Sequence, residues 1–140
     1  MFCPNPVDMF TGAQGGSGLN VLIVDDSVAI RMILNRALRR TELPLDKVFE
    51  AGDGCAALEI LKNEQVSVIL SDINMPNMDG LQLLATLKES EQWTSLPVVM
   101  ISTESSQTKV MEALRLGAKG FIRKPFAPDE IHDKLATFFS

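Results

Sequence analysis

Three aspartates stand where short apolar runs of the sequence end. Asp25 and Asp26 directly follow the run 21–24, and Asp72 comes two residues after the run 66–70. Runs of this length and composition predict strands that are buried on both faces. Because the carboxyl ends of parallel strands meet at one edge of a sheet, where ligands bind, we expect the three carboxylates to lie close together.

A serine and a lysine end two further apolar runs in the same way. Ser102 follows the run 98–101 and Lys124 follows the run 120–123, so both are expected at the same edge of the sheet. Clustered carboxylates repel one another unless a cation balances their charge, and oxygen ligands without His or Cys favour Mg2+ over zinc. A carboxylate beside Mg2+ can attack a phosphoryl group and form an acyl phosphate, with the lysine and the hydroxyl contacting the phosphoryl oxygens.

The elements that must hold these residues alternate along the chain. Each predicted strand is followed by a helix-spaced apolar pattern, and the strands are expected at 21–24, 48–49, 66–70, 98–101 and 120–123. Asp53 is placed to cap the second helix. The inner face of the first helix is expected to include Ile33, and that of the fourth helix Leu114. Five strand-helix units with short links predict an α/β fold, a doubly wound parallel sheet with five helices on its two faces.

Composition limits the other possibilities. Residues 1–18 are rich in Pro and Gly and predict a flexible N-terminal arm, whereas 19–140 have the size of one domain. Lys and Arg number 13 against 18 Asp and Glu, and this net charge of -5 argues against nucleic-acid binding. The two cysteines suggest neither disulfides nor a metal cluster, and no segment has the pattern of a signal peptide or membrane anchor. We therefore expect a cytoplasmic protein.

Several motifs give the chain a resemblance to a known family. They are Val-Asp-Asp-Ser at 24–27, Asp-Ile-Asn-Met-Pro-Asn-Met-Asp-Gly at 72–80, Met-Ile-Ser at 100–102 and Gly-Phe-Ile-Arg-Lys-Pro-Phe at 120–126. Together they resemble the receiver domains of two-component signalling, and among these the single-domain chemotaxis regulators, over about residues 19–139. The resemblance implies the flavodoxin-like strand order 2-1-3-4-5. It also implies a phosphorylation switch, not an enzyme for an external substrate, with a histidine kinase as phosphodonor.

The resemblance also assigns roles around the predicted cluster. Asp72 looks like the phosphoacceptor. Asp26, Asp72 and the backbone carbonyl of Asn74 would hold Mg2+ directly, and Asp25 would reach the ion through water. Lys124 would bind phosphoryl oxygens and precede a cis peptide bond.

Two further roles concern the output of the switch. Ser102 and Phe121 resemble the pair that reports phosphorylation to the surface, although the aromatic position here has no hydroxyl. Asn74 and Glu104 would flank the phosphoryl site and tune the lifetime of the phosphorylated state. The downstream protein would bind the surface of the fourth helix, fifth strand and fifth helix of a monomer, with a candidate footprint of Lys109, Glu112, Lys119 and Arg123.

Other interpretations of the same residues remain open. A receiver that is part of a larger response regulator or a hybrid kinase would have the same sequence pattern. An aspartyl-phosphate phosphohydrolase would need a second acid two residues after the nucleophile, where this chain has Asn74. A flavin carrier would need a hydroxyl-rich phosphate loop after the first strand, where Asp25 and Asp26 would repel a phosphate. The basic residues of the first helix are either a solvated face or a kinase-docking surface.

Overall fold

Five parallel strands form one sheet in the order β2-β1-β3-β4-β5, which confirms the predicted order. The computed structural model describes residues 18–139, so the predicted arm at 1–18 lies outside the described residues except for Gly18. The strands are β1 Leu19–Val24, β2 Leu45–Ala51, β3 Val68–Ser71, β4 Val98–Ser102 and β5 Gly120–Arg123. Their carboxyl ends share one edge of the sheet, because all neighbouring pairs are parallel.

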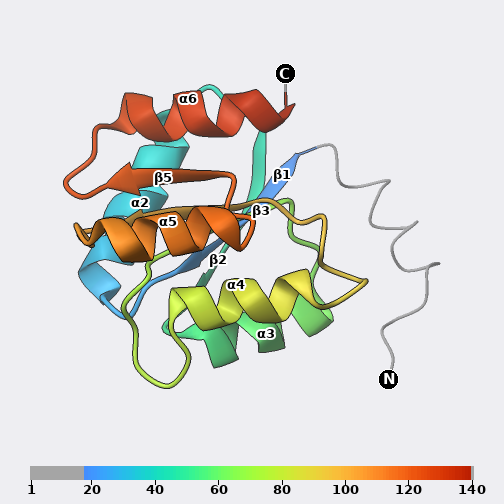
Figure 1. The fold of residues 1–140 in the computed structure, drawn as a ribbon. Coiled ribbons are helices and arrows are strands. Elements are labelled where there is room, and N and C mark those ends of the chain that lie inside the picture. The colour runs from blue at the N-terminus through green and yellow to red at the C-terminus, as the bar shows by residue number, and fades with distance from the viewer. Residues whose placement is uncertain (1–17, 140) are drawn as a thin grey trace.

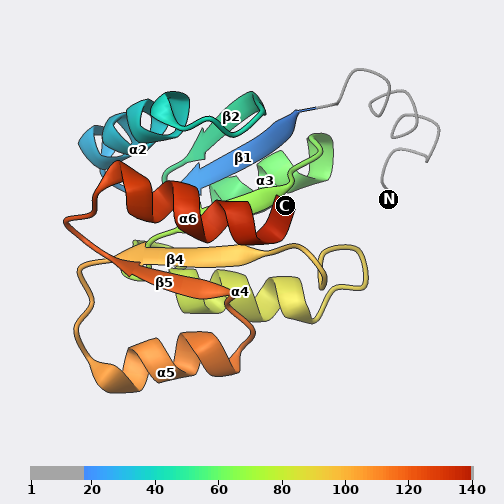
Figure 2. The same cartoon turned by 90° about the horizontal axis from the view of Figure 1, so that it is seen from above.

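Helices cover both faces of the sheet, as expected for alternating strands and helices (Figures 1 and 2). On one face lie α2 Val28–Arg40 and α6 Pro128–Phe139. On the other lie α3 Gly54–Asn63, α4 Gly80–Lys88 and α5 Gln107–Arg115. Among residues 18–139, no helix combines the length and the apolar character that crossing a membrane requires.

Two hydrophobic clusters fill the space between the sheet and these helix layers. Leu22 and Ile69 of the strands pack in the cluster that contains Leu84 of α4, whereas Ile23 and Leu70 pack in the cluster that contains residues of α2 and α6. Successive strand residues thus enter opposite clusters. This explains why the central strands are continuous apolar runs and not alternating patterns.

Polar side chains cap the starts of α2, α3, α4 and α5. The Ser27 hydroxyl accepts from the Ile30 amide at 3.2 Å, and the predicted cap Asp53 accepts from the Ala56 amide at 2.8 Å. Asp79 and Gln82 form a reciprocal capping box at the start of α4. The helix ends of these four strand-to-helix loops are therefore fixed by side-chain hydrogen bonds.

The structure corrects several expectations from the sequence. β1 begins at Leu19 and β3 spans Val68–Ser71, whereas strands at 21–24 and 66–70 were expected. β2 has seven residues, not two, because polar residues at positions 46, 47 and 50 interrupt the apolar residues of this edge strand and hide its length. Its pairing with β1 also shifts register between Leu19 and Val21. Ile33 and Leu114 were expected in the core, but they are 49% and 43% exposed. Each lies at the margin of its helix's apolar stripe, where periodicity does not separate core from surface.

Candidate functional site

The three predicted aspartates form an acidic cluster at the carboxyl edge of the sheet. One carboxylate oxygen each of Asp25, Asp26 and Asp72 lies within 4.8 Å of the others. Asp25 and Asp72 are buried, whereas Asp26 is exposed. The neighbouring strands β1 and β3 bring them together, since the Asp72 amide donates to the Val24 carbonyl at 2.8 Å. The predicted gathering of these side chains is therefore confirmed.

Lys124 reaches into the acidic cluster from the end of β5. Its Nζ donates to Asp25 Oδ2 at 2.7 Å and to Asp72 Oδ2 at 3.3 Å. Three carboxylates thus share a single ammonium, so acidic groups are in excess in the cluster. This excess, presented by oxygen ligands of which one is exposed, fits a divalent cation such as Mg2+. The peptide bond from Lys124 to Pro125 is cis, as the resemblance implied.

Backbone and side-chain donors fix the orientation of the two buried carboxylates. Asp72 Oδ1 accepts from the Ile73 amide at 2.7 Å, and Asp25 Oδ1 accepts from the Ser27 amide at 2.9 Å. Arg31 Nη1 donates to the Asp25 carbonyl at 2.6 Å while its Nε donates to Glu50. This places one of the four arginines of α2 in a structural contact, and it leaves the other three exposed on the helix surface.

The loop that follows Asp72 is tied to the start of α3. Asn77 Nδ2 donates to Asp53 Oδ2 at 2.7 Å, and the Gly54 amide donates to the Met78 carbonyl at 3.0 Å. Hydrogen bonds from the Ala56 amide and the Asn77 side chain lower the pKa of Asp53. Asn77 has φ of 65°, a left-handed conformation that asparagine tolerates better than most residues. These ties hold the loop at the edge of the sheet.

Ser102 and Phe121 occupy neighbouring strands. Ser102 is fully buried, and its Oγ accepts from the Glu104 amide at 3.1 Å. The Ser102 carbonyl accepts from the Lys124 amide at 3.1 Å, which connects it to the strand that delivers the lysine. Phe121 is half-buried, lies opposite Met100 in the sheet and packs against the hydrophobic cluster beneath α3, α4 and α5.

A bridge of three polar side chains joins the loops after β3 and β4. Asn74 Nδ2 donates to Glu104 Oε1 at 3.0 Å, and Lys109 Nζ donates to Asn74 Oδ1 at 3.2 Å. Lys109 Nζ also lies 3.7 Å from Glu104 Oε1. Sequence reasoning placed Lys109 only on the outer surface, because no motif indicates that α5 turns its first residues toward the loop after β3.

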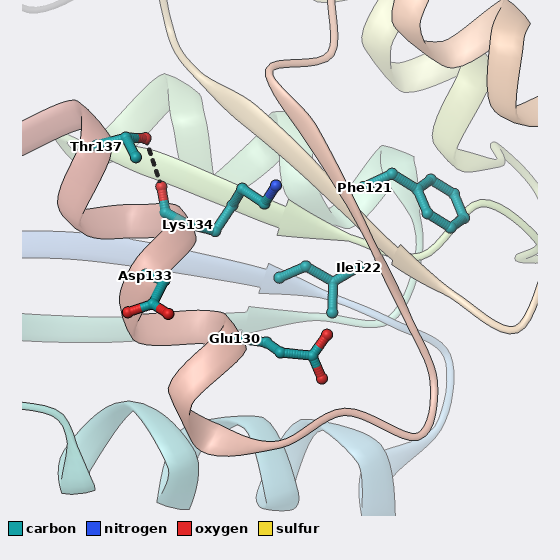
Figure 3. Close-up of a pocket in the computed structure, with 6 residues that line it drawn as sticks. All are labelled: Phe121, Ile122, Glu130, Asp133, Lys134 and Thr137. Atoms are coloured by element: carbon teal, nitrogen blue, oxygen red, sulfur yellow. Dashed lines mark hydrogen bonds between the residues drawn. The ribbon is translucent and has the colours of Figure 1, made fainter.

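A separate hollow lies beside the edge strand β5 (Figure 3). Phe121 and Ile122 project from opposite sides of the strand, and the Thr137 hydroxyl donates to the Lys134 carbonyl at 2.8 Å. The rest of the lining comes from acidic side chains of α6, namely Glu130 and Asp133. This hollow lies between β5 and α6, on part of the surface expected to bind a protein partner.

Comparison with known proteins decides the family. Residues 21–136 match the response regulator receiver domain family. The chain belongs to the response regulator receiver family. A receiver of this kind accepts a phosphoryl group in two-component signalling and acts as a signalling switch.

Chemotaxis proteins are among the relatives of this receiver. It is 38% identical over 118 residues to a chemotaxis protein CheY homologue of Campylobacter jejuni, covering 84% of this chain and 89% of that protein. It is 36% identical over 121 residues to chemotaxis protein CheY-3 of Vibrio cholerae, covering 86% of this chain and 92% of that protein. The receiver is thus of the CheY type.

Solved structures show the same fold. Chemotaxis protein CheY4 of Vibrio cholerae matches with a TM-score of 0.77 and 33% identity, covering 86% of this chain and 98% of that chain. The complex of CheX, CheY, BeF3 and magnesium from Borrelia burgdorferi matches with a TM-score of 0.79 and 31% identity, covering 91% of this chain and 94% of that chain. Both support the flavodoxin-like, CheY-like architecture of the five-stranded parallel sheet described above.

Proposed function

We propose that this receiver accepts a phosphoryl group on Asp72 from a phosphohistidine of a histidine kinase, in a reaction that requires Mg2+. One observation carries the proposal: the Asp72 carboxylate lies in a cluster with Asp25 and Asp26, and Lys124 Nζ lies 3.3 Å from Asp72 Oδ2. The nucleophile, the cation-binding oxygens and the ammonium needed for phosphoryl transfer are therefore within reach of one another.

The reactants of the proposed transfer are the phosphohistidine and the Asp72 carboxylate. An oxygen of the Asp72 carboxylate forms the new bond to phosphorus while the bond from phosphorus to the histidine nitrogen breaks, and that electron pair stays on the nitrogen. Lys124, now shared between two carboxylates, can turn its ammonium to the phosphoryl oxygens as Asp72 loses its charge. Attack of water on the phosphorus later returns free phosphate and the Asp72 carboxylate. Asn74 has no acidic proton to donate to a leaving group, which argues against phosphohydrolase activity on other substrates.

The acidic cluster has oxygen ligands that would hold Mg2+. Asp26, Asp72 and the Asn74 backbone carbonyl are proposed as direct ligands, with Asp25 acting through water. Lys124 Nζ lies closer to Asp25 Oδ2, at 2.7 Å, than to Asp72 Oδ2, at 3.3 Å, so Asp25 is the more firmly engaged of the two, which supports the indirect role. The ion would balance the negative charge of the phosphoryl oxygens and of the cluster.

A small phosphodonor tests this proposal directly. Incubation with acetyl phosphate and Mg2+ should add one phosphoryl group, because the residues proposed for the transfer all belong to the receiver. Intact-protein mass spectrometry measures the gain in mass. Addition of a chelator before the donor should prevent labelling, and full labelling without a divalent cation would contradict the proposed role of Mg2+.

We further propose that Ser102 and Phe121 carry the signal to the surface of α5, β5 and α6. Ser102 Oγ now accepts from the Glu104 amide, and a phosphoryl oxygen on Asp72 would offer the hydroxyl a stronger, charge-assisted partner. Movement of Ser102 would leave space for the Phe121 ring to turn inward. A downstream protein would then recognise the altered surface, and the chemotaxis names of the relatives favour a cytoplasmic, single-domain chemotaxis regulator.

The switch pair can be tested by replacing Ser102 with alanine. Beryllofluoride with Mg2+, which imitates the phosphoryl group, should shift the ring resonances of Phe121 in the wild-type protein. In Ser102→Ala this shift should be largely lost, since no hydroxyl moves toward the site. Side-chain NMR measures both, and Ser105→Ala, an exposed position in the same loop, is the control. Equal Phe121 shifts in wild type and Ser102→Ala would remove Ser102 from the mechanism.

A further inference from the structure

The bridge of Asn74, Glu104 and Lys109 is a triangle of contacts between loops at the carboxyl edge of the sheet. Its members come from three segments, the loop after β3, the loop after β4 and the first turn of α5. Asn74 lies two residues after Asp72, and Glu104 lies two residues after Ser102. The bridge therefore connects the loop of the proposed phosphoacceptor with the loop of the proposed switch hydroxyl.

Lys109 supplies the positive charge of this bridge. The Asn74 amide donates through Nδ2 to the Glu104 carboxylate and accepts through Oδ1 from the Lys109 ammonium, so each end of the amide faces the charge that suits it. The bonds from the Asn74 side chain and the Ser106 amide lower the pKa of Glu104, and the nearby Lys109 charge acts in the same direction. Without the ammonium, Asn74 Oδ1 would lose a charged donor, and only the bond to Glu104 would orient the amide.

The same glutamate also holds Ser102. The Glu104 amide donates to Ser102 Oγ at 3.1 Å, while Glu104 Oε2 accepts from the Ser106 amide at 2.8 Å. The position of the Glu104 backbone is thus fixed by its own carboxylate on one side and by the buried hydroxyl on the other. If Ser102 moves toward a phosphoryl group, the bond from the Glu104 amide must break or its loop must follow.

We propose that Lys109 is a positioning residue that holds the loops after β3 and β4 together and thereby restrains phosphorylation of Asp72. For Ser102 to leave the Glu104 amide and reach a phosphoryl oxygen, the loop that carries Glu104 must move, and the bridge to Asn74 and Lys109 resists that movement. The contacts of Lys109 determine how readily this loop moves, although Lys109 does not contact the reacting atoms. This inference rests on the proposed function, since it assigns a restraint to the same site.

A second possible role for Lys109 predicts the opposite effect of its removal on the rate of phosphorylation. An ammonium at the edge of the site would attract an anionic phosphodonor, so its removal would slow phosphorylation. As a restraint, its removal speeds phosphorylation. The two roles are therefore separated by the direction of the change and not by its size.

The experiment compares Lys109→Met with Lys109→Arg, which keeps a cation, and with Lys62→Met as a matched control. Lys109 is 49% exposed, and Lys62 is a surface lysine in an ion pair on α3, so all three variants should fold. With acetyl phosphate and Mg2+, Lys109→Met should be phosphorylated roughly two- to fivefold faster than wild type, the factor expected for loss of an exposed charge-assisted contact. Lys109→Arg and Lys62→Met should remain close to wild type.

NMR of the metal-free protein provides a readout that does not depend on phosphorylation. Lys109→Met should shift the side-chain amide resonances of Asn74 and the backbone amide resonance of Glu104, and Lys62→Met should shift neither. Slower or unchanged phosphorylation of Lys109→Met, or unchanged resonances, would overturn the restraint. Failure of the wild-type protein to be labelled would instead refute the proposed function, and the NMR comparison would still decide whether Lys109 holds the bridge.

Discussion

Replacing Asp72 with asparagine is expected to abolish phosphoryl acceptance completely. The substitution keeps the shape of the side chain and the oxygen that accepts from the Ile73 amide, but it removes the anionic nucleophile. Because Asp72 is one of three carboxylates around a single ammonium, loss of its charge should not unfold the chain. Mass spectrometry after incubation with acetyl phosphate and Mg2+ should show no phosphorylated species, and thermal unfolding should show a folded protein.

Asp46→Asn is a suitable control for this result. Asp46 is exposed on the edge strand β2, so the same chemical change there should leave labelling at the wild-type level. Undiminished labelling of Asp72→Asn would show that another residue accepts the phosphoryl group. The proposed roles of Lys124 and of the acidic cluster would then have to be reassigned as well.

Gly80→Ala is expected to cause a large loss of stability at the same site. A Cβ atom at this position would lie 2.1 Å from the carbonyl oxygen of Asp72 and 2.9 Å from the Ile73 Cα, and both of these atoms belong to the backbone. Relief of such a contact requires movement of the loop that carries the proposed phosphoacceptor. Overpacking of this kind costs about 1–3 kcal/mol or more in the free energy of unfolding. Urea denaturation followed by circular dichroism measures the loss.

Gly52→Ala is the matched control, because the nearest atom to a Cβ there is the flexible end of Arg31 at 3.7 Å. Its free energy of unfolding should change little. We also expect Gly80→Ala to be phosphorylated more slowly than Gly52→Ala, since only the first substitution displaces the Asp72 backbone. Equal stabilities of the two variants would mean that the loop after β3 moves freely enough to admit a methyl group.

The fold was predictable because its central strands are buried on both faces. β1, β3 and β4 are continuous apolar runs, and each is followed by a helical pattern. The edge strand β2 carried a weaker signal, since Asp46, Lys47 and Glu50 interrupt its apolar residues. Its length depends on pairing with β1, which is a tertiary contact that local sequence does not encode.

The acidic cluster and its lysine were predictable from topology alone, because each side chain ends a parallel strand. The contacts that orient these side chains could not be predicted in this way. Arg31 reaches the Asp25 carbonyl from one turn into α2, and Asn77 reaches Asp53 across 24 positions of sequence. Such contacts depend on how loops meet in space, and the residue types involved also suit an ordinary solvent-exposed turn. Periodicity likewise placed Ile33 and Leu114 inside, although both side chains are nearly half exposed.

The edge strand β2 has a consequence for the behaviour of the protein at high concentration. One side of β2 pairs with β1, and its other side ends the sheet with backbone groups that another chain could bond. Exposed Asp46 and Lys47 and the register shift opposite Leu19 make this edge a poor template for an added strand. Edge-to-edge aggregation through β2 is thereby discouraged.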